Sequence, residues 1–282
     1  MSMHLHNWMK NIGDDTSVKD INIPGTHDSA TKYCQFSLIS SCQNKSIKEQ
    51  LEIGVRAFDI RVDKNTLVHS FCKCRASLLG SVLTLDDVIG DIFSFLNENP
   101  SEIVLMFFKM DNGESSLECF RLLYENFIKT NPDKWYLENK IPALGEVRGK
   151  IVLLSRTEYD TEKAGIDFNA MPYQGGTKET KWEDFSPNGE DTVTVQDRYM
   201  LLWYKKWKKA VKPLLDESEK LKGNMILNFL SDAGIPCMPR FVSKYINHKF
   251  LSYNLKKGNH YGLIMFDFVN KKLTEKVINS NK

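Results

Sequence analysis

The feature that most restricts the fold of this chain is an alternation of short apolar runs with longer amphipathic stretches. Runs that are continuously apolar are typical of parallel strands buried on both faces, and intervening helical periodicity indicates crossover helices. The pattern therefore predicts an α/β protein built as a (β/α) barrel of the TIM type. The predicted strands are Ile21–Ile23, Val55–Val62, Thr66–Ser70, Glu102–Phe108, Lys150–Ser155, Thr192–Val195, Met225–Leu230 and Gly262–Phe268. The predicted helices are Thr84–Asn97, Ser115–Lys129, Tyr199–Leu221 and Arg240–Lys256.

The length and composition limit the domain count and the classes of ligand. A chain of 282 residues fits one large barrel or two ordinary domains. Because no repeat, low-complexity tract or Pro/Gly/Ser-rich linker divides it, we expect residues 1–282 to form a single catalytic domain. The formal net charge of +2 argues against a nucleic-acid-binding protein, and we expect no nucleic-acid partner. We expect the protein to act as a monomer.

The sequence shows no apolar run of the roughly 20 residues that span a bilayer. Its start, MSMHLHNWMKNIGDD, does not resemble a secretory signal, so we expect a protein that stays inside the cell or whose signal was removed. The six cysteines are too sparse for a disulfide scaffold, and we expect mostly free thiols, with a Cys34–Cys42 disulfide as the alternative. The Cys72-Lys73-Cys74 segment lacks the spacing of a structural zinc site.

Charged and polar side chains lie at or just after the ends of most predicted strands. In a barrel of this type the carboxyl ends of the strands form the active site. Asp59, Arg61 and Asp267 stand within otherwise apolar segments, where an unpaired charge is costly. These positions predict a polar site at one end of the barrel, made from His27, Asp28, Asp59, Arg61, His69, Lys109, Arg156, Asp197, Tyr199 and Asp267.

Several segments resemble one known family, in family order from about Trp8 to Asn270. INIPGTHDSA, which contains His27, and QLEIGVRAFDIR, which contains Arg61, resemble the two signatures of the phosphatidylinositol-specific phospholipase C catalytic domain. Lys109 after an apolar strand, GKIVLLSR, VQDRY and Asp267 also resemble family landmarks. The likeness is to the small, metal-independent bacterial type. The QNKSI segment before the second signature is also similar to protozoan enzymes that cleave glycosylphosphatidylinositol anchors.

The resemblance implies a distorted barrel that cleaves phosphatidylinositol to diacylglycerol and inositol 1,2-cyclic phosphate. It assigns His27 as the general base for the inositol 2-hydroxyl, with Asp267 orienting its imidazole. His69, together with Asp28, would protonate the leaving oxygen. A histidine titrates in the range that such proton transfers need. His69 follows a shorter hairpin than the family usually has, and no other nearby histidine can take its role.

Arg61 indicates whether the reaction requires a metal ion. The resemblance places it where calcium-dependent relatives carry an acidic ligand, and a guanidinium can meet two phosphate oxygens at once. We therefore expect no calcium requirement, no other metal and no cofactor. The alternative interpretation of Arg61 is a structural ion pair with Asp59, and we expect Asp59 to orient it in either case.

Four further positions match the headgroup-binding residues of the family: Lys109, Arg156, Asp197 and Tyr199. Charged groups can bind the hydroxyls of inositol, and Tyr199 can stack on the ring. Each could instead be an ordinary barrel-rim residue. The resemblance favours headgroup binding for Arg156 and Asp197 and leaves Lys109 open.

The expected partner is phosphatidylinositol, or a glycosylphosphatidylinositol, in a membrane surface. Two segments are candidates for peripheral membrane contact. Trp203–Lys209 combines aromatic rings with lysines, although a surface helix packed on the barrel explains it equally simply. Phe36–Ile39 is the second candidate.

Two alternative functions remain open at the level of sequence. A glycerophosphodiester phosphodiesterase is also a barrel with two histidines, but it needs acidic metal ligands where this chain has Arg61. A catalytically silent lipid-binding barrel would be expected to have lost a histidine or Arg61, and this chain keeps all three.

Overall fold

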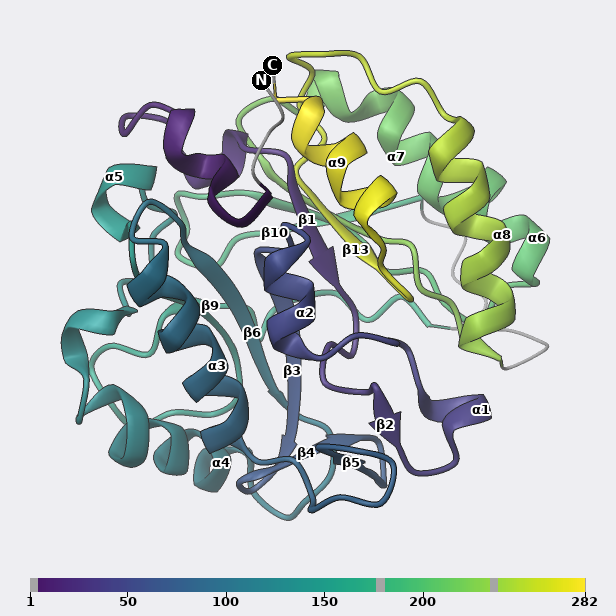
Figure 1. The fold of residues 1–282 in the computed structure, drawn as a ribbon. Helices are drawn as coiled ribbons and strands as arrows, with labels where there is room; N and C mark the ends of the chain where they lie inside the picture. The colour runs from purple at the N-terminus through teal and green to yellow at the C-terminus, as the bar shows by residue number, and fades with distance from the viewer. Residues whose placement is uncertain (1–4, 176–180, 234–237, 282) are drawn as a thin grey trace.

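The structure, a computed structural model, describes residues 5–175, 181–233 and 238–281. It is a mixed α/β protein in which helices surround a strongly twisted sheet (Figure 1). Eight strands follow one another in parallel, in the order β11-β12-β13-β1-β3-β6-β8-β9, and the short β7 (Trp135–Tyr136) also pairs in parallel with β8. The eight are β1 (Ile23–Thr26), β3 (Ala57–Asp63), β6 (Val104–Met110), β8 (Ile151–Arg156), β9 (Ile166–Asp167), β11 (Val193–Gln196), β12 (Met225–Phe229) and β13 (Leu263–Phe266). The predicted α/β barrel is confirmed. It is a distorted one, because hydrogen bonds do not close the sheet within the described residues.

The predicted strand Thr66–Ser70 is not a barrel strand. β4 (Thr66–His69) pairs antiparallel with β3 and with β5 (Cys72–Arg75), and β5 pairs antiparallel with β2 (Tyr33–Cys34). Only Lys64 and Asn65 separate β3 from β4, whereas a parallel neighbour needs a crossover of about a dozen residues or more. Lys64 has a φ of 53°, as a tight turn demands. The barrel continues instead through β6, which pairs with β3 along six residues.

β1 also begins later than predicted, at Ile23 rather than Ile21, and continues through Pro24 and Gly25. The predicted strand stopped before these residues because both are unusual inside strands. Gly25 is required here by space, since a Cβ at this position would collide with Met265 and Ala57 on the two flanking strands. The extension carries the chain directly to His27 at the end of the barrel.

Alternate strand residues face two separate cores. One core fills the barrel, as Leu105, Phe107 and Leu154 do. The other lies between the sheet and the outer helices, as Met106 and Phe108 do. Side chains alternate along a strand, so Lys109 lies on the same face of β6 as Leu105 and Phe107 and also points into the barrel.

The helices cover the outside of the sheet. α3 begins after Thr84, whose backbone N–H donates to the Asp87 carboxylate, and it buries an apolar face that includes Ile89 and Ile92. This helix lies within a residue of its predicted bounds. The helices are α1 (Ser37–Ser40), α2 (Ile47–Glu52), α3 (Leu85–Glu98), α4 (Ser116–Leu123), α5 (Leu144–Val147), α6 (Trp203–Lys206), α7 (Lys212–Glu217), α8 (Pro239–Ser252) and α9 (Lys271–Asn279).

Shorter elements complete the chain. The 3₁₀ turns are Leu5–Asn11, Val18–Asp20, Pro132–Lys134 and Ser218–Leu221, and the π-helical turns are Tyr124–Ile128 and Trp207–Val211. Two short strands lie at the sheet edges, β7 (Trp135–Tyr136) and β10 (Glu183–Phe185). Within the part of the chain that the structure describes, no helix has the length and apolarity needed to cross a bilayer.

Both tryptophans of Trp203–Lys209 pack against the protein, whereas Tyr204 is exposed. The Trp203 ring contacts Phe241 and Tyr245 edge to face, and Trp207 is buried. Lys206 is fully buried and donates to the Gln196 side chain and the Arg198 carbonyl. The interpretation of this segment as a helix packed on the barrel is therefore confirmed.

Candidate active site

The polar site predicted at the strand ends is present as one cavity of roughly 490 Å³. Such a volume lies in the range of small-molecule sites. Its walls include eight of the ten predicted site residues, namely His27, Arg61, His69, Lys109, Arg156, Asp197, Tyr199 and Asp267. Asp28 and Asp59 are buried directly behind them, in contact with Arg61.

His27 lies between two carboxylates. Its Nδ1 donates to Asp267 Oδ1 at 2.9 Å, and its Nε2 lies 3.3 Å from Asp28 Oδ2. Burial lowers the pKa of His27, but the Asp28 and Asp267 charges outweigh burial and raise it to about 9. The pKa of Asp267 is raised by burial, against the opposing charge of His27. The imidazolium form of His27 is thus stabilised, with its tautomer fixed by Asp267.

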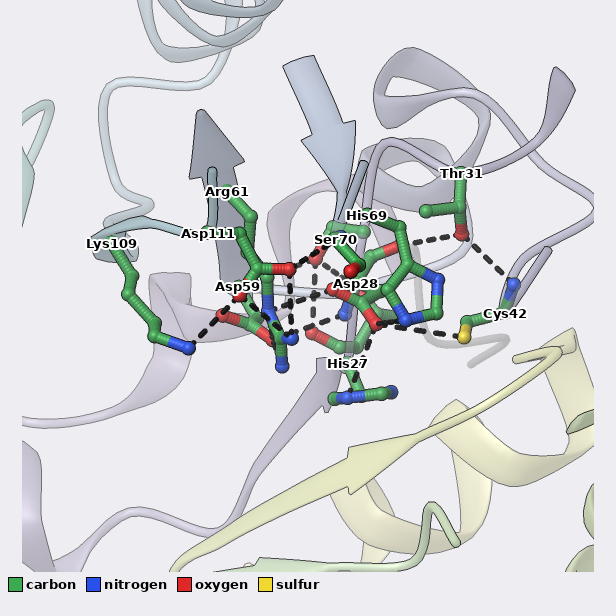
Figure 2. A network of polar contacts seen from close by, with 12 residues as sticks. His27, Asp28, Thr31, Cys42, Asp59, Arg61, His69, Ser70, Lys109 and Asp111 are labelled. Carbon is green, nitrogen blue, oxygen red and sulfur yellow. Dashed lines mark hydrogen bonds and ion pairs between the residues drawn. The ribbon is translucent and has the colours of Figure 1, made fainter. Parts of the chain in front are cut away.

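Asp28 is the point where the site's groups meet (Figure 2). Its Oδ2 contacts both imidazoles, at 3.3 Å from His27 Nε2 and 3.2 Å from His69 Nε2, while its Oδ1 pairs with Arg61 Nε at 2.7 Å. Asp28 also has a φ of 43°, an uncommon conformation for a residue other than glycine. Strain of this kind persists where the surrounding contacts hold it in place.

His69 reaches the site from the β4–β5 hairpin. Its Nδ1 donates to the Ser40 carbonyl at 2.6 Å, which directs Nε2 toward Asp28. The next residue, Ser70, has a φ of 53° and donates its backbone N–H to Asp111 at 2.6 Å. The Ser40 carbonyl of α1 and the Asp111 carboxylate therefore hold His69 and Ser70 of the hairpin in place.

Arg61 is surrounded by carboxylates. It contacts Asp28 at 2.7 Å and Asp59 at 2.9 Å, and lies 3.5 Å from Asp111. Burial raises the pKa of Asp59, but the charges of Arg61 and His27 and the hydrogen bonds from Arg61 and the Asp28 backbone together outweigh burial and lower it to about 2. Burial likewise lowers the pKa of Arg61, but the three carboxylates raise it well above its usual range. Arg61 therefore carries a fixed, fully charged guanidinium on the cavity wall.

The four predicted headgroup residues also line the cavity. Lys109 pairs with Asp111 at 2.9 Å, and the Tyr199 ring lies edge to face with Tyr173 at 5.7 Å between centroids. Burial lowers the pKa of Arg156, and burial raises the pKa of Asp197 despite the nearby cations. These four side chains come from the ends of three strands, β6, β8 and β11, and line one cavity.

Sequence reasoning missed several residues of this site. Asp111 binds Arg61, Lys109 and the Ser70 amide, and its position two residues after Lys109 on β6 was the available signal. Lys206 is buried beneath the cavity, and burial lowers its pKa to about 8 despite three neighbouring carboxylates. Because Lys206 stands in a run of lysines that is typical of a protein surface, the sequence did not indicate that it is buried.

Four cysteines, Cys34, Cys42, Cys72 and Cys74, lie near the site, whereas Cys119 lies on α4. The five that the structure describes are free thiols, and the alternative pairing of Cys34 with Cys42 is wrong. Cys34 is opposite Cys74 across the β2–β5 pair, with 3.8 Å between the sulfur atoms, while Cys42 Sγ lies 3.6 Å from Asp28 Oδ2. Cys237 lies outside the described residues.

Comparison with known proteins places this geometry in a family. The model of the phosphatidylinositol-specific phospholipase C X domain matches residues 21–157, which contain both histidines and Arg61. A 1-phosphatidylinositol phosphodiesterase of Staphylococcus aureus is 32% identical over 248 residues, covering 83% of this chain and 77% of that protein. The chain belongs to the phosphatidylinositol-specific phospholipase C family.

Other members of the phosphatidylinositol-specific phospholipase C family extend the match along the chain. A 1-phosphatidylinositol phosphodiesterase of Listeria monocytogenes is 27% identical, covering 100% of this chain and 86% of that protein. A solved S. aureus phosphatidylinositol-specific phospholipase C superposes with a TM-score of 0.83 at 25% identity, covering 100% and 99% of the two chains. The L. monocytogenes phospholipase structure shares the fold, with a TM-score of 0.80 at 24% identity and 99% coverage of both chains.

Proposed function

We propose that this chain cleaves phosphatidylinositol to diacylglycerol and inositol 1,2-cyclic phosphate. The observation that carries the proposal is the contact of Asp28 with both imidazoles and with Arg61 at the wall of the cavity. This arrangement supplies two proton-transfer groups and one fixed positive charge in a single space. The S. aureus and L. monocytogenes relatives are named for the phosphodiesterase activity on phosphatidylinositol.

The first step is the attack of the inositol 2-hydroxyl on the phosphorus. Neutral His27 takes the hydroxyl proton at Nε2, and Asp267 stabilises the imidazolium that forms. The new P–O bond closes a five-membered ring within one molecule. The protein therefore needs to orient the hydroxyl and does not need to bind a second reactant.

The second step is the departure of diacylglycerol. The bond from phosphorus to the glycerol oxygen breaks, and His69 Nε2 gives that oxygen a proton, together with Asp28. Meanwhile Arg61 binds the non-bridging phosphate oxygens, where negative charge accumulates. Its three carboxylate partners hold the guanidinium in place without filling the cavity.

Arg61 also supports a reaction without calcium. The guanidinium provides the positive charge that a cation supplies in a metal-dependent phosphodiesterase, and it carries that charge at any physiological pH. The presence of Arg61 therefore argues against a metal-dependent glycerophosphodiester phosphodiesterase. We propose that activity needs no metal and no cofactor.

The headgroup is bound by the remaining predicted residues of the cavity wall. Arg156 and Asp197 form hydrogen bonds to inositol hydroxyls, and Tyr199, held by Tyr173, stacks on the ring face. Lys109, paired with Asp111, contributes charge at the rim. These roles are proposals that the shared cavity supports.

The substrate is drawn from a membrane surface. Large apolar side chains are exposed at α1, in the β4–β5 turn, in the β5–α3 connection and at the start of α8, and Ile39 also lines the cavity. These side chains are Phe36, Leu38, Ile39, Phe71, Leu78, Leu79, Met238 and Phe241. Cations flank the same surface: Lys32, Arg75, Arg240 and Lys244. We propose that this rim enters the bilayer interface while the cations contact anionic lipids, and that the chain acts as a monomeric single domain.

The test is the release of diacylglycerol from mixed micelles of detergent and phosphatidylinositol, with phosphatidylcholine micelles as the control. We expect diacylglycerol from phosphatidylinositol alone, and none from an Arg61→Ala variant that remains folded. A parallel incubation with a glycosylphosphatidylinositol-anchored protein tests the second substrate. Headgroup binding without any diacylglycerol would instead support the silent lipid-binding barrel.

A further inference from the structure

Asp28 Oδ2 faces a third side chain besides the two histidines. Cys42 Sγ lies 3.6 Å from this oxygen, and His27 Nε2 lies 3.3 Å from it (Figure 2). Together these nitrogen, oxygen and sulfur donors lie within 4.8 Å of one another. Both His27 and Cys42 line the cavity, so a hydrated cation can reach them.

Two of the three separations match those around a tetrahedral zinc ion. Zinc lies about 2.0–2.2 Å from nitrogen and oxygen ligands and about 2.3 Å from thiolate sulfur. The edges of such a tetrahedron are about 3.3–3.4 Å between nitrogen and oxygen, and about 3.6 Å between sulfur and oxygen. The two observed distances to Asp28 Oδ2, 3.3 Å and 3.6 Å, already have these values.

The neighbouring contacts hold each ligand in place. His27 donates Nδ1–H to Asp267, which is the carboxylate–histidine arrangement that orients metal-binding imidazoles. Arg61 pairs with Oδ1 of Asp28, so Oδ2 is available to a metal ion. The Cys42 backbone is fixed at both ends, since its N–H donates to Thr31 Oγ1 and its carbonyl accepts from the Phe268 N–H.

The local charge also favours a cation. The contact network around Arg61 contains four carboxylates, those of Asp28, Asp59, Asp111 and Asp267, against the two permanent cations Arg61 and Lys109. Thiolate and imidazole ligands select zinc-like ions, whereas calcium takes six to eight oxygen ligands. Three protein ligands leave a fourth position open on zinc.

We propose that His27, Asp28 and Cys42 form a binding site for a zinc-like divalent cation, and that the bound cation inhibits the enzyme. Binding releases the Cys42 thiol proton and any proton on His27 Nε2 to solvent. The cation then occupies the nitrogen that must accept the proton of the substrate. The inhibitory part of this inference rests on the proposed function, whereas the binding part does not.

The experiment uses the full chain, freed of metal by a chelator and then titrated with cobalt(II) as a spectroscopic probe for zinc. We expect the near-ultraviolet charge-transfer absorption of a cobalt–thiolate bond, abolished by stoichiometric zinc and by Cys42→Ser. Cys119→Ser, which removes another buried thiol on α4, should leave the absorption unchanged. If Cys42→Ser fails to fold, Cys42→Ala takes its place.

The same proteins are then assayed on phosphatidylinositol with zinc, each compared with its own metal-free rate. Zinc should inhibit the wild type and the Cys119 variant, and at least about tenfold more zinc should be needed for the Cys42 variant. Calcium should not inhibit any of them. Cobalt–thiolate absorption in a protein without phosphodiesterase activity would support the metal site while contradicting the proposed function. Absence of the absorption, or equal zinc inhibition of the wild type and the Cys42 variant, would overturn the site.

Discussion

At the residue scale, the proposed reaction depends on how Asp28 connects the two histidines. In this proposal, the carboxylate between the two imidazoles lets a proton enter at His27 and leave at His69 without crossing open solvent. The other oxygen of Asp28 contacts Arg61, so the proposed phosphate-binding group and the proposed proton-transfer groups contact the same carboxylate. Changes at any of these positions should therefore affect turnover far more than folding.

Replacing either histidine by alanine tests the two proton transfers. We expect His27→Ala and His69→Ala each to lower kcat by about 10²–10⁴-fold, because each removes one general acid–base group. The exposed His248 on α8 provides the matched control, and His248→Ala should retain wild-type turnover. Turnover is measured on phosphatidylinositol micelles, and folding by circular dichroism. Full activity of a folded His69→Ala variant would remove His69 from the mechanism.

Asp267→Asn tests the electrostatic setting of His27. The Asp267 carboxylate raises the pKa of His27, so its neutralisation should lower that pKa. A general base acts in its deprotonated form, and its rate therefore rises as pH climbs through its pKa. The rising limb of kcat/KM should consequently move to lower pH in the variant, while the maximal rate falls because the imidazolium is less stabilised. A limb at the same pH in both proteins would show that another group controls it.

The sequence identifies the charged residues that stand alone in apolar strands, such as Arg61 and Asp267, because burial makes an unpaired charge costly. It does not identify residues whose role depends on a fold-generated neighbour. Asp111 and Cys42 look ordinary in sequence, and only the pairing of β3 with β6 and the segment after α1 bring them to Arg61 and Asp28. The burial of Lys206 could not be predicted either, because Lys208 and Lys209 in the same basic run are exposed.

At the element scale, the β4–β5 hairpin is the part of the fold that sequence periodicity misread. Thr66–His69 has the composition of a barrel strand, but the two-residue connection after β3 forces an antiparallel pairing. Parallel strands such as β6 and β8 were predictable because both faces are buried and their apolar runs are continuous. The misread hairpin nevertheless carries His69 to the predicted site.

The exposed rim on α1 gives a prediction that separates membrane contact from chemistry. A Phe36→Ser/Leu38→Ser double variant should bind phosphatidylinositol vesicles more weakly, because it removes two exposed apolar side chains from the proposed interface. Its turnover on a short-chain, monomeric phosphatidylinositol should stay close to that of the wild type. Vesicle sedimentation and the soluble assay provide the two readouts. Unchanged vesicle binding would remove α1 from the interface.

At the scale of the whole molecule, the barrel is tied together at the end opposite the site. Arg56, fully buried at the start of β3, pairs with Glu102 at 2.9 Å and donates to the carbonyls of Leu51 and His6. Burial lowers the pKa of Arg56 to about 10 and raises the pKa of Glu102, although each is partly offset by the partner's charge. This pair joins the amino-terminal segment to the sheet.

Glu102→Leu should therefore destabilise the protein by about 3–5 kcal/mol, because it leaves the Arg56 charge buried without its partner. The free energy of unfolding is measured by urea denaturation. Lys129→Ala, which breaks an exposed i,i+4 pair with Glu125, serves as the control and should have little effect. A Glu102 variant as stable as the wild type would mean that the pair does not stabilise the fold.

The most direct test of metal-independent cleavage is phosphorus NMR of the protein mixed with phosphatidylinositol in detergent, with and without a chelator. We expect the resonance of inositol 1,2-cyclic phosphate to appear at the same rate in both samples. This result requires intramolecular attack by the 2-hydroxyl and a reaction supported by Arg61 without calcium. A resonance that disappears on chelation would contradict the role of Arg61, and the absence of any cyclic product would contradict the proposed reaction.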